Sequence, residues 1–600
     1  MRYNDIVMTE RPTIKIEARN NWSKILLPSL PYKDRQDFLE EVNEALSYTP
    51  AFSEWSPKLK SGKWDGKLYL FNKRKHIFPS GCLSIVREVI EACGYQAKLI
   101  DKRRKPSSNY GLKLVDERED RPGEHFGLRD YQAEALKQAM KYGRGILSCP
   151  TGSGKTTIFT SIIAEISTYP VIVFVPTRLL LYQTKRELEE MLRDEDGEKV
   201  EVGIIGDGKV DIKPITVCII NSALAAYGLR FNNSKQRCED DTRKRIPKDE
   251  REDLSAVASK KEEIKDLIEN ARVVIADEAH RSASDMWKQI LFRCGKSYYR
   301  LGFSATPFRE DGRELEIQAI FGKIIYEIEL RELIDRGYLM DPEIYMVTIN
   351  HDPDGAILER EFEDPLTEEV TKKELYIPVE DWEYRDFYEQ IVIYNDELNQ
   401  HIAQYAKTFN EQGLSVLILV KEIAHGEILE ALIPDSIFLK GKNTTNQRES
   451  AIDELKDKSF LTLIATTIAD MGLDLPNLDC LILAGGGGSD PTRYQEKKKK
   501  RKTISKSKTM VKWGKVGSIN NDDAPNFLTL GGEISDRAQK EEIRFGGVIQ
   551  QRLGRVLRKA EGKEKAIVID FWFKNSVMQA QSAARKKIFE NLKLKVKRIR

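Results

Sequence analysis

The sequence has few cysteines and no long apolar run, and each absence excludes a class of protein. The seven cysteines are scattered singly without a C-x-x-C pair, which argues against a disulfide framework or a zinc site. Apolar runs stay well short of the roughly 18 residues that a membrane-spanning helix needs. The first residues, MRYNDIVMTERPT, are charged and contain no apolar signal core. We therefore expect a cytoplasmic protein without a membrane partner.

The chain is long, and its charges are segregated. At roughly 100–200 residues per domain, a chain of 600 residues is expected to form three or four domains. The net charge of +2 conceals a strongly basic run at Lys497–Lys502 and a basic C-terminal stretch from Arg585. Both segments have the charge to neutralise nucleic-acid phosphates, which would make binding strongly salt dependent. The alternative for the lysine run is a solvated insertion without a ligand.

The pattern of apolar runs divides the chain into four parts. Residues 1–122 mix short strands with a helix expected at Cys82–Cys93, which indicates a small α+β domain followed by a linker. Residues 123–345 and 395–600 alternate short buried strands with helices, which predicts a parallel sheet covered on both faces in each part. Residues 346–394 are acidic and irregular and are interpreted as a connector.

Two charged insertions interrupt this pattern. Residues 225–268 form a helix-prone insertion in the first α/β part, and residues 490–545, which begin with the lysine run, interrupt the second. The predicted fold class is therefore α/β, with two parallel-sheet domains in tandem after a small α+β domain.

The segment CPTGSGKT at residues 149–156 has the pattern of a phosphate-binding loop. A buried strand is expected before it at Arg144–Ser148 and a helix after it at Thr157–Ile166, the context in which such loops bind a nucleoside triphosphate. Glycines let the backbone wrap the phosphates, so that N–H groups point inward at the positive end of the helix. The residues expected to contact the nucleotide are Thr151, Gly152, Ser153, Gly154, Lys155, Thr156 and Thr157.

Acidic residues follow a second buried strand, at Asp277-Glu278-Ala279-His280. Lys155 of the loop can reach the β- and γ-phosphates, and the Thr156 hydroxyl can hold Mg²⁺ together with Asp277. Glu278 can orient and deprotonate an attacking water. The alternative is a charged cluster that merely caps a strand, but the phosphate-binding loop upstream favours the catalytic interpretation.

A pair of arginines lies late in the second α/β part, in the sequence QRLGRVLR at residues 551–558. Arg555 and Arg558 are three residues apart and are expected to share one helix face. Two guanidinium groups there can stabilise negative charge that develops during phosphoryl transfer, as arginine fingers do. The alternative is a solvated basic helix.

In combination and in order, these motifs resemble those of superfamily 2 helicases. The resemblance covers roughly residues 124–572 and implies two RecA-like domains that share one ATP, with Mg²⁺, at their interface. It assigns further roles, by position in the motifs, to residues of this sequence. Tyr131 and Gln132 would recognise adenine, and Arg178 and Thr466 would contact the nucleic-acid backbone. Gly472 and Asp474 would lie near the nucleotide. The residues implied to take part in catalysis are Lys155, Glu278, Gln551, Arg555 and Arg558.

Two features indicate a branch of that superfamily. The sequence SATPFREDG at residues 304–312 resembles DNA translocases of the XPB and restriction-subunit branch more than RNA helicases. The Trp-Asp-Gly sequence at residues 64–66, followed by Phe-Pro and Gly-Tyr pairs, resembles the N-terminal domain of UvsW-type phage recombination helicases. This likeness implies DNA contacts at Lys63, Trp64 and Lys67. The alternative is a hairpin whose tryptophans are core and whose lysines are solvated.

The expected function is that of an ATP-dependent DNA helicase or translocase. The UvsW-type likeness implies branched DNA as the substrate, such as forks, D-loops, R-loops with their RNA–DNA hybrid, or Holliday junctions, besides plain duplex or single strands. A phage-encoded chain would act in the host bacterial cytoplasm. Two alternatives stay open: a duplex-DNA translocase subunit of a restriction or remodelling complex, and an RNA helicase. The sequence does not indicate a protein partner.

Overall fold

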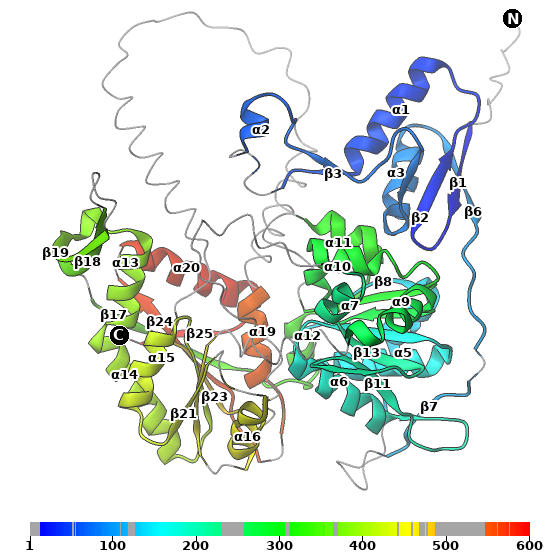
Figure 1. The fold of residues 1–600 in the computed structure, drawn as a ribbon. Helices are drawn as coiled ribbons and strands as arrows, with labels where there is room; N and C mark the ends of the chain where they lie inside the picture. The colour runs from blue at the N-terminus through cyan, green and yellow to red at the C-terminus, as the bar shows by residue number, and fades with distance from the viewer. Residues whose placement is uncertain are drawn as a thin grey trace, which may run out of the picture. The chain divides into compact units, whose positions relative to one another are not determined.

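The protein forms two compact units, Met1–Glu329 and Leu330–Arg600 (Figure 1). The computed structural model describes residues 12–50, 53, 56–108, 110–117, 127–229, 257–305, 313–351, 353–363, 370–440, 443, 445–457, 460–466, 475, 478–485, 547–560, 562–574 and 576–599. Across these residues, none of the helices is both long and apolar enough to cross a bilayer.

The first unit begins with a small α+β domain. Its four-stranded sheet has the order β5-β2-β1-β6, with β1 and β6 parallel and the other pairs antiparallel. Along β1, buried isoleucines alternate with more exposed residues, as expected for a strand with one face on a core. The elements are β1 (Thr13–Ala18), β2 (Trp22–Leu26), α1 (Tyr32–Ala45), β3 (Ser47–Tyr48), α2 (Pro57–Lys60), β4 (Leu68–Tyr69), β5 (Ile77–Pro79), α3 (Leu83–Ala92) and β6 (Gln96–Asp101).

An eight-stranded sheet follows in the same unit, in the order β12-β11-β13-β9-β14-β15-β8-β16. All neighbours in it are parallel except β11 and β12. The strands are β8 (Arg144–Ser148), β9 (Val171–Val175), β11 (Val202–Gly206), β12 (Lys209–Asp211), β13 (Ile215–Ile219), β14 (Val273–Ala276), β15 (Tyr299–Ser304) and β16 (Ile324–Glu327). Every residue of β9 and β13 is buried, since helices cover both faces of a parallel sheet.

The helices of this part connect its strands. They are α4 (Asp130–Tyr142), α5 (Lys155–Ile166), α6 (Arg178–Met191), α7 (Ile220–Ala226), α9 (Lys261–Asn270), α10 (Asp285–Leu291) and α11 (Glu314–Phe321). Of the insertion expected at residues 225–268, α9 lies within the described residues, and its Ile264, Leu267 and Ile268 are buried.

The α+β domain is docked on the eight-stranded sheet by polar and aromatic contacts. Asn21 accepts a hydrogen bond at 2.6 Å from the buried Arg300 of β15, and its own amide donates to the Phe292 carbonyl oxygen at 2.6 Å. The Trp22 ring stacks on the Phe292 ring with centroids 5.2 Å apart. Asn21 lies in the turn between β1 and β2, and Trp22 is the first residue of β2, so the start of β2 and the turn before it anchor the domain.

A second contact joins the same two parts at α11. The Tyr48 hydroxyl donates to Glu316 Oε1 at 2.5 Å, and Glu316 also pairs with Lys288 and Arg313 at 2.6 and 2.7 Å. Close packing accompanies this network, because a side chain at Gly81 would place its Cβ 2.0 Å from the backbone oxygen of Gln318. The α+β domain and the large sheet therefore share a buried junction.

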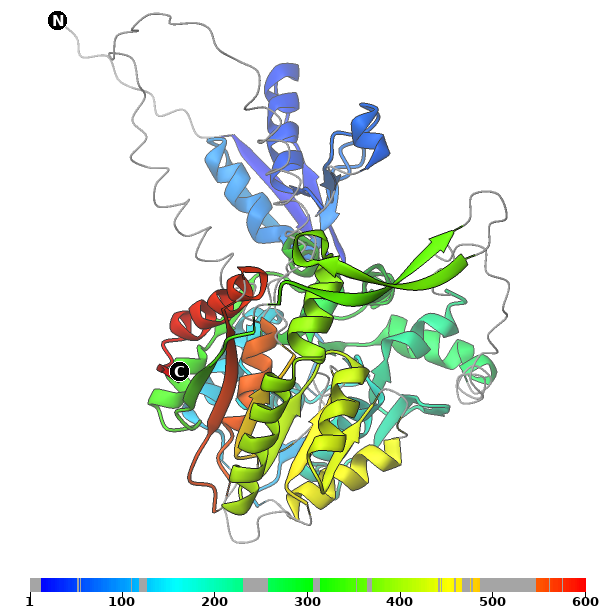
Figure 2. The same cartoon turned by 90° about the vertical axis from the view of Figure 1, so that its left-hand side faces the viewer.

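The second unit is built on a seven-stranded sheet in the order β21-β22-β20-β23-β24-β17-β25, whose neighbours are all parallel. Its strands are β17 (Glu343–Ile349), β20 (Val416–Leu419), β21 (Ser436–Leu439), β22 (Thr462–Ala465), β23 (Cys480–Leu483), β24 (Ile567–Phe573) and β25 (Val596–Ile599). The helices are α12 (Leu330–Asp335), α13 (Tyr384–Tyr388), α14 (Asp396–Glu411), α15 (Ile423–Leu432), α16 (Thr445–Lys456), α19 (Gly547–Val556) and α20 (Ser576–Asn591). Figure 2 shows α14 and α15 lying over one face of this sheet.

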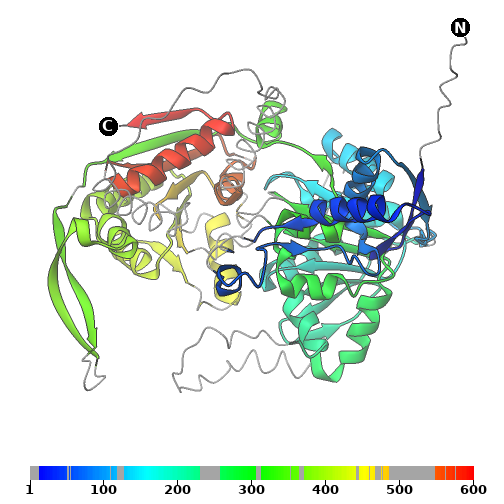
Figure 3. The same ribbon diagram turned by 90° about the horizontal axis from the view of Figure 1, so that it is seen from above.

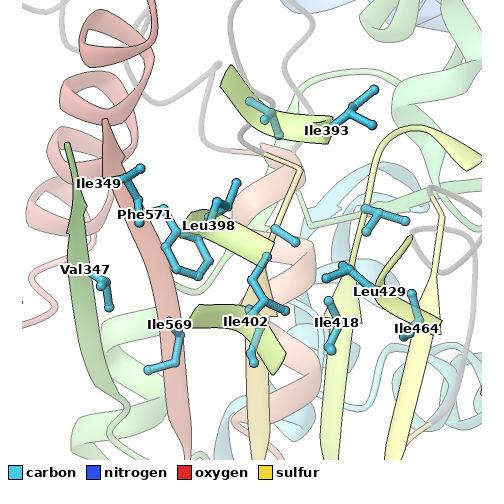
Figure 4. Packing of buried hydrophobic residues seen from close by; sticks show 14 of the residues in the cluster. Val347, Ile349, Ile393, Leu398, Ile402, Ile418, Leu429, Ile464, Ile569 and Phe571 are labelled. Carbon is cyan, nitrogen blue, oxygen red and sulfur yellow. The ribbon is translucent and has the colours of Figure 1, made fainter. Parts of the chain in front are cut away.

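Apolar side chains from distant parts of the chain meet under α14 and α15. Leu398 and Ile402 of α14 and Leu429 of α15 belong to the same buried cluster as Ile418 and Ile464 of the sheet (Figure 4). The cluster also contains Val347 and Ile349 of β17. Its burial contributes hydrophobic stabilisation to this unit.

The boundary between the units differs from the expected one. The sequence places it at residue 345, whereas β17, which includes that residue, pairs in parallel with β24 and β25 of the second sheet. The expected connector, residues 346–394, also has regular structure. It contains the antiparallel ribbon of β18 (Gly355–Glu363) and β19 (Val370–Pro378), drawn in light green in Figure 3, and Trp382 is fully buried against the second unit's core.

A buried ion pair joins α20 to β24. Arg585 Nε lies 2.8 Å from Asp570 Oδ2, and the two side chains are 3% and 0% exposed. Arg585 also donates to the Phe571 carbonyl oxygen at 2.9 Å. Removing one partner of such a pair leaves a charge buried without compensation.

We therefore predict that Arg585→Met destabilises the second unit by about 3–5 kcal/mol. The neighbouring Lys586→Met is the matched control, because Lys586 pairs with Glu590 at the surface and its loss should cost less than about 1 kcal/mol. Amide exchange of β24 measured at increasing urea concentrations gives the loss of unfolding free energy in each variant. Equal midpoints for the two variants would contradict the structural role of the buried pair.

Candidate nucleotide site and nucleic-acid contacts

Three neighbouring parallel strands bring the predicted nucleotide residues to one edge of the first sheet. The phosphate-binding loop follows β8, Ser304 ends β15, and Asp277 follows β14 directly. Since β14 pairs with β15 and β15 with β8, all in parallel, the three carboxyl ends meet at the same edge. Ligands of open α/β sheets bind at this edge.

The phosphate-binding loop has the backbone that its glycines permit. Gly152 and Gly154 have φ values of 87° and 74°, a region in which residues with a side chain are strained. The Ser153 hydroxyl closes the loop by donating to the Pro150 carbonyl oxygen at 2.8 Å. Helix α5 begins at Lys155, two residues earlier than the sequence predicts. Its first N–H groups therefore belong to the loop residues that face a phosphate.

Tyr131 and Gln132, expected to read adenine, are tied to the loop. The Tyr131 hydroxyl and the Gln132 amide donate to the Ser153 carbonyl oxygen at 2.7 and 3.1 Å. The Gln132 amide oxygen accepts from the Arg129 backbone N–H at 3.0 Å. Both side chains are buried, so in this structure they hold the loop in place.

The acidic pair has opposite electrostatic surroundings at its two carboxyl groups. Burial and the neighbouring Glu278 charge raise the pKa of Asp277. Burial also opposes ionisation of Glu278, but the positive charge of Lys155 and a hydrogen bond from His280 outweigh it and lower the pKa of Glu278. Glu278 is therefore ionised at neutral pH, as a group that accepts a proton from water must be.

His280 connects the acidic pair to β15, a role that the sequence motifs do not reveal. Its Nδ1 lies 3.3 Å from Glu278 Oε2 and 3.1 Å from Ser304 Oγ. Glu278 itself has a φ of 54°, unusual for a residue with a side chain. The histidine thus helps to hold the Glu278 carboxylate in position. Thr306 and Pro307, of the motif that begins at Ser304, lie outside the described residues.

The residues around the loop fit a Mg²⁺–nucleotide complex. Within the described ranges, His, Cys, Asp and Glu side chains do not gather in groups of three or more that could hold a metal ion. Mg²⁺ typically takes only one or two protein ligands beside water and phosphate oxygens. Thr156 and Asp277 would supply such ligands, and the ion would neutralise phosphate charge.

The predicted nucleic-acid contacts lie on different units. Arg178, the first residue of α6, forms an ion pair with Asp207 at 3.1 Å. Thr466, at the end of β22, is buried. Gly472 and Asp474, as well as the lysine run and the rest of residues 490–545, lie outside the described residues.

The predicted arginine pair does not lie on one helix face. Helix α19 ends at Val556, so that it carries Gln551 and Arg555 but not Arg558, whose backbone instead forms an antiparallel bridge with Leu339. Arg555 is 4% exposed. The expectation of a shared face assumed that the helix continues, but the bridge replaces its last turn.

Lys563 holds the end of that helix and was not indicated by any motif. Its ammonium group donates to the carbonyl oxygens of Val556 and Arg558 at 2.5 and 2.9 Å. Cations are favourable at the C-terminus of a helix, where carbonyl groups lack partners. Burial lowers the pKa of Lys563 to about 8. Lys563 thereby helps to set the backbone position of Arg558.

Of the three predicted contacts in the α+β domain, Lys63 is exposed. The Trp64 indole N–H donates to the Lys67 carbonyl oxygen at 2.7 Å, and the Lys67 ammonium group pairs with Glu44. The Trp64 ring is partly buried, so it contributes both to the loop's packing and to its surface.

Two family models match separate parts of the chain, and curated proteins and a solved structure are similar to it. Residues 125–309 match the family described as "Type III restriction enzyme, res subunit", and residues 396–501 match the "Helicase conserved C-terminal domain". "Putative helicase 22" of Sulfolobus islandicus filamentous virus is 25% identical over 78% of this chain and 68% of its own length. The DNA 3'-5' translocase XPB2 of Sulfurisphaera tokodaii is 26% identical over 60% of this chain and 74% of its own. The crystal structure of UvsW from bacteriophage T4 aligns over 98% of this chain and 99% of its own with 14% identity and a TM-score of 0.37.

The carboxylate arrangement predicts the effect of Glu278→Gln. The amide keeps the size of the side chain but cannot accept a proton from water, so ATP turnover should fall by about 10²–10⁴-fold while ATP still binds. Steady-state hydrolysis and titration with a fluorescent ATP analogue measure the two effects. Lys155→Ala should instead weaken binding, and Glu263→Gln, on the exposed face of α9, should change neither. Normal turnover in Glu278→Gln would refute the assignment.

Proposed function

The chain belongs to the superfamily 2 helicases, and from that premise we propose that it uses ATP to remodel branched DNA such as forks, D-loops, R-loops or Holliday junctions. A helicase that acts on branches must contact more than one arm of its substrate. The proposal therefore needs a DNA-contacting surface outside the two sheet domains, held at a defined position beside the motor.

The observation that carries the proposal is the buried junction between the α+β domain and the large sheet of the first unit. Arg300 donates a hydrogen bond to Asn21 of the α+β domain. It lies on β15, the strand that ends with Ser304 at the nucleotide edge. Lys58 of α2 and Lys63, which follows that helix, are exposed in the segment between β3, the strand of Tyr48, and β4. A basic segment on a domain anchored in this way would move with the nucleotide-binding sheet and hold a second DNA arm beside it.

The proposed chemistry divides between the units. In the first, Lys155 binds the β- and γ-phosphates, and Glu278 takes a proton from the attacking water. In the second, Arg555 and Arg558 would complete the site when the two sheets close on ATP. Closing and reopening would shift the backbone contacts at Arg178 and Thr466 along a strand. Because relatives are named for 3'-5' movement, we extend that polarity to this chain.

A second candidate function is movement along duplex DNA without strand separation. The match of residues 125–309 to the restriction-enzyme family favours it. Displacement of a triplex-forming strand from intact duplex, without unwinding of any tailed or branched substrate, would select this candidate.

A substrate panel tests the proposal directly. We expect ATP hydrolysis to be stimulated more by DNA than by RNA, and forked, R-loop and Holliday substrates to be unwound faster than blunt duplex of equal length. Duplexes with a single 3' or 5' tail report the polarity. Equal unwinding rates on all DNA substrates would contradict the proposed preference for branched DNA. Stimulation of ATP hydrolysis by RNA alone would overturn the assignment of DNA as the substrate.

The role of the α+β domain predicts the behaviour of Lys58→Ala/Lys63→Ala. Loss of two phosphate contacts should reduce the slope of log affinity against log salt by roughly two for forked DNA. ATPase stimulation by single-stranded DNA should change much less, because the sheet domains remain intact. The matched control is Lys15→Ala/Lys98→Ala, which removes two exposed lysines from paired positions of β1 and β6. Equal effects of the two double variants would contradict a specific contact.

A further inference from the structure

Four side chains of the first unit form a cluster in which one carboxylate connects two groups that can bind phosphate. Asp207 accepts from the Tyr182 hydroxyl at 2.9 Å and lies 3.1 Å from Arg178 Nη1. The Lys209 ammonium group lies 5.2 Å from the centroid of the Tyr182 ring. The cluster reaches solvent, since the side chains of Arg178 and Asp207 are 36% and 26% exposed.

The cluster lies at the same edge of the sheet as the nucleotide residues, but over other strands. Arg178 follows β9 and Asp207 follows β11, and both strands pair in parallel with β13 between them. The edge therefore has two parts: the ends of β8, β14 and β15 carry the nucleotide residues, and the ends of β9 and β11 carry this cluster. The N-terminus of the 14-residue helix α6, which favours negative charge, adds to the second part.

We infer that Arg178, Tyr182 and Lys209 form a binding site for a backbone phosphate of the DNA, and that Asp207 is an internal competitor which occupies Arg178 and Tyr182 until DNA arrives. This inference rests on the proposed function, because it assumes that DNA is the substrate. It extends the predicted contact at Arg178 to two further residues and assigns a role to a carboxylate that no motif includes.

The competition follows from the chemistry of the donors. A guanidinium group and a hydroxyl that bind a carboxylate present the same N–H and O–H donors that bind a phosphate. When a phosphate replaces Asp207, Arg178 exchanges one anion for another and the released carboxylate takes up a cation. The exchange therefore reduces both the net gain in affinity and the number of ions released on binding.

The backbone at Asp207 supports a dedicated position for this carboxylate. Asp207 has a φ of 54° and stands between Gly206 and Gly208 in the turn from β11 to β12. Aspartate and asparagine adopt this conformation more readily than other residues with side chains. Asn at this position can keep the turn and remove only the charge.

The test compares DNA binding by Asp207→Asn with binding by the wild-type chain. Fluorescence anisotropy with labelled single-stranded and duplex DNA should show roughly two- to tenfold tighter binding, because a partly exposed ion pair no longer has to be broken. The slope of log affinity against log salt should steepen by about 0.7 for single strands and about 0.9 for duplex, the change expected for one additional neutralised phosphate. Asp211→Asn, an exposed carboxylate on β12, is the control for the change in net charge.

A double-mutant cycle with Arg178→Ala identifies the site. The gain from Asp207→Asn should fall to that of Asp211→Asn when Arg178 is absent, and Lys209→Ala should weaken binding. An unchanged affinity in Asp207→Asn, a gain equal to that of Asp211→Asn, or a gain that persists without Arg178 would each overturn the competitor role. Failure of the wild-type chain to bind any DNA would instead overturn the proposed function, and this inference with it.

Discussion

Parallel pairing of β9, β14, β15 and β8 is the constraint on which the site of the first unit depends. In a parallel sheet every strand ends at the same edge, so segments separated by more than a hundred residues of sequence meet there. Both faces of such a sheet are covered, and β9 and β14 are accordingly buried throughout and rich in branched apolar residues. Loss of β15, which lies between β14 and β8, would separate the phosphate-binding loop from the acidic pair.

Charge at this edge is balanced by a small number of specific contacts. Lys155 keeps Glu278 ionised although burial opposes it, and His280 connects the same carboxylate to β15. At the other part of the edge, Asp207 balances Arg178. The Arg178–Asp207 pair places a cation and an anion in contact where a phosphate group would bind, so a ligand there would exchange an existing ion pair rather than fill an empty site.

Several features were predictable from sequence because they depend on local pattern. The glycines of the phosphate-binding loop require positive φ, and short apolar runs before each motif form the strands at the nucleotide edge. Other features were not predictable. The sequence pattern at residues 551–558 predicts one continuous helix. In the structure α19 ends at Val556, and Arg558 forms a bridge with Leu339 instead. The acidic composition of residues 346–394 suggested a connector, although Trp382 is packed in the second unit's core.

The sequence by itself determined the class of enzyme, the phosphate-binding loop and the alternation of strands and helices in the two sheet domains, since these follow from motifs of a few adjacent residues and from apolar periodicity. Only the tertiary structure decided which side chains neutralise one another and how the α+β domain is held. Asn21 lies 279 positions from Arg300, and Asp207 lies 29 positions from Arg178. Contacts over such separations depend on how strands pair and where a domain docks, and no local pattern encodes them.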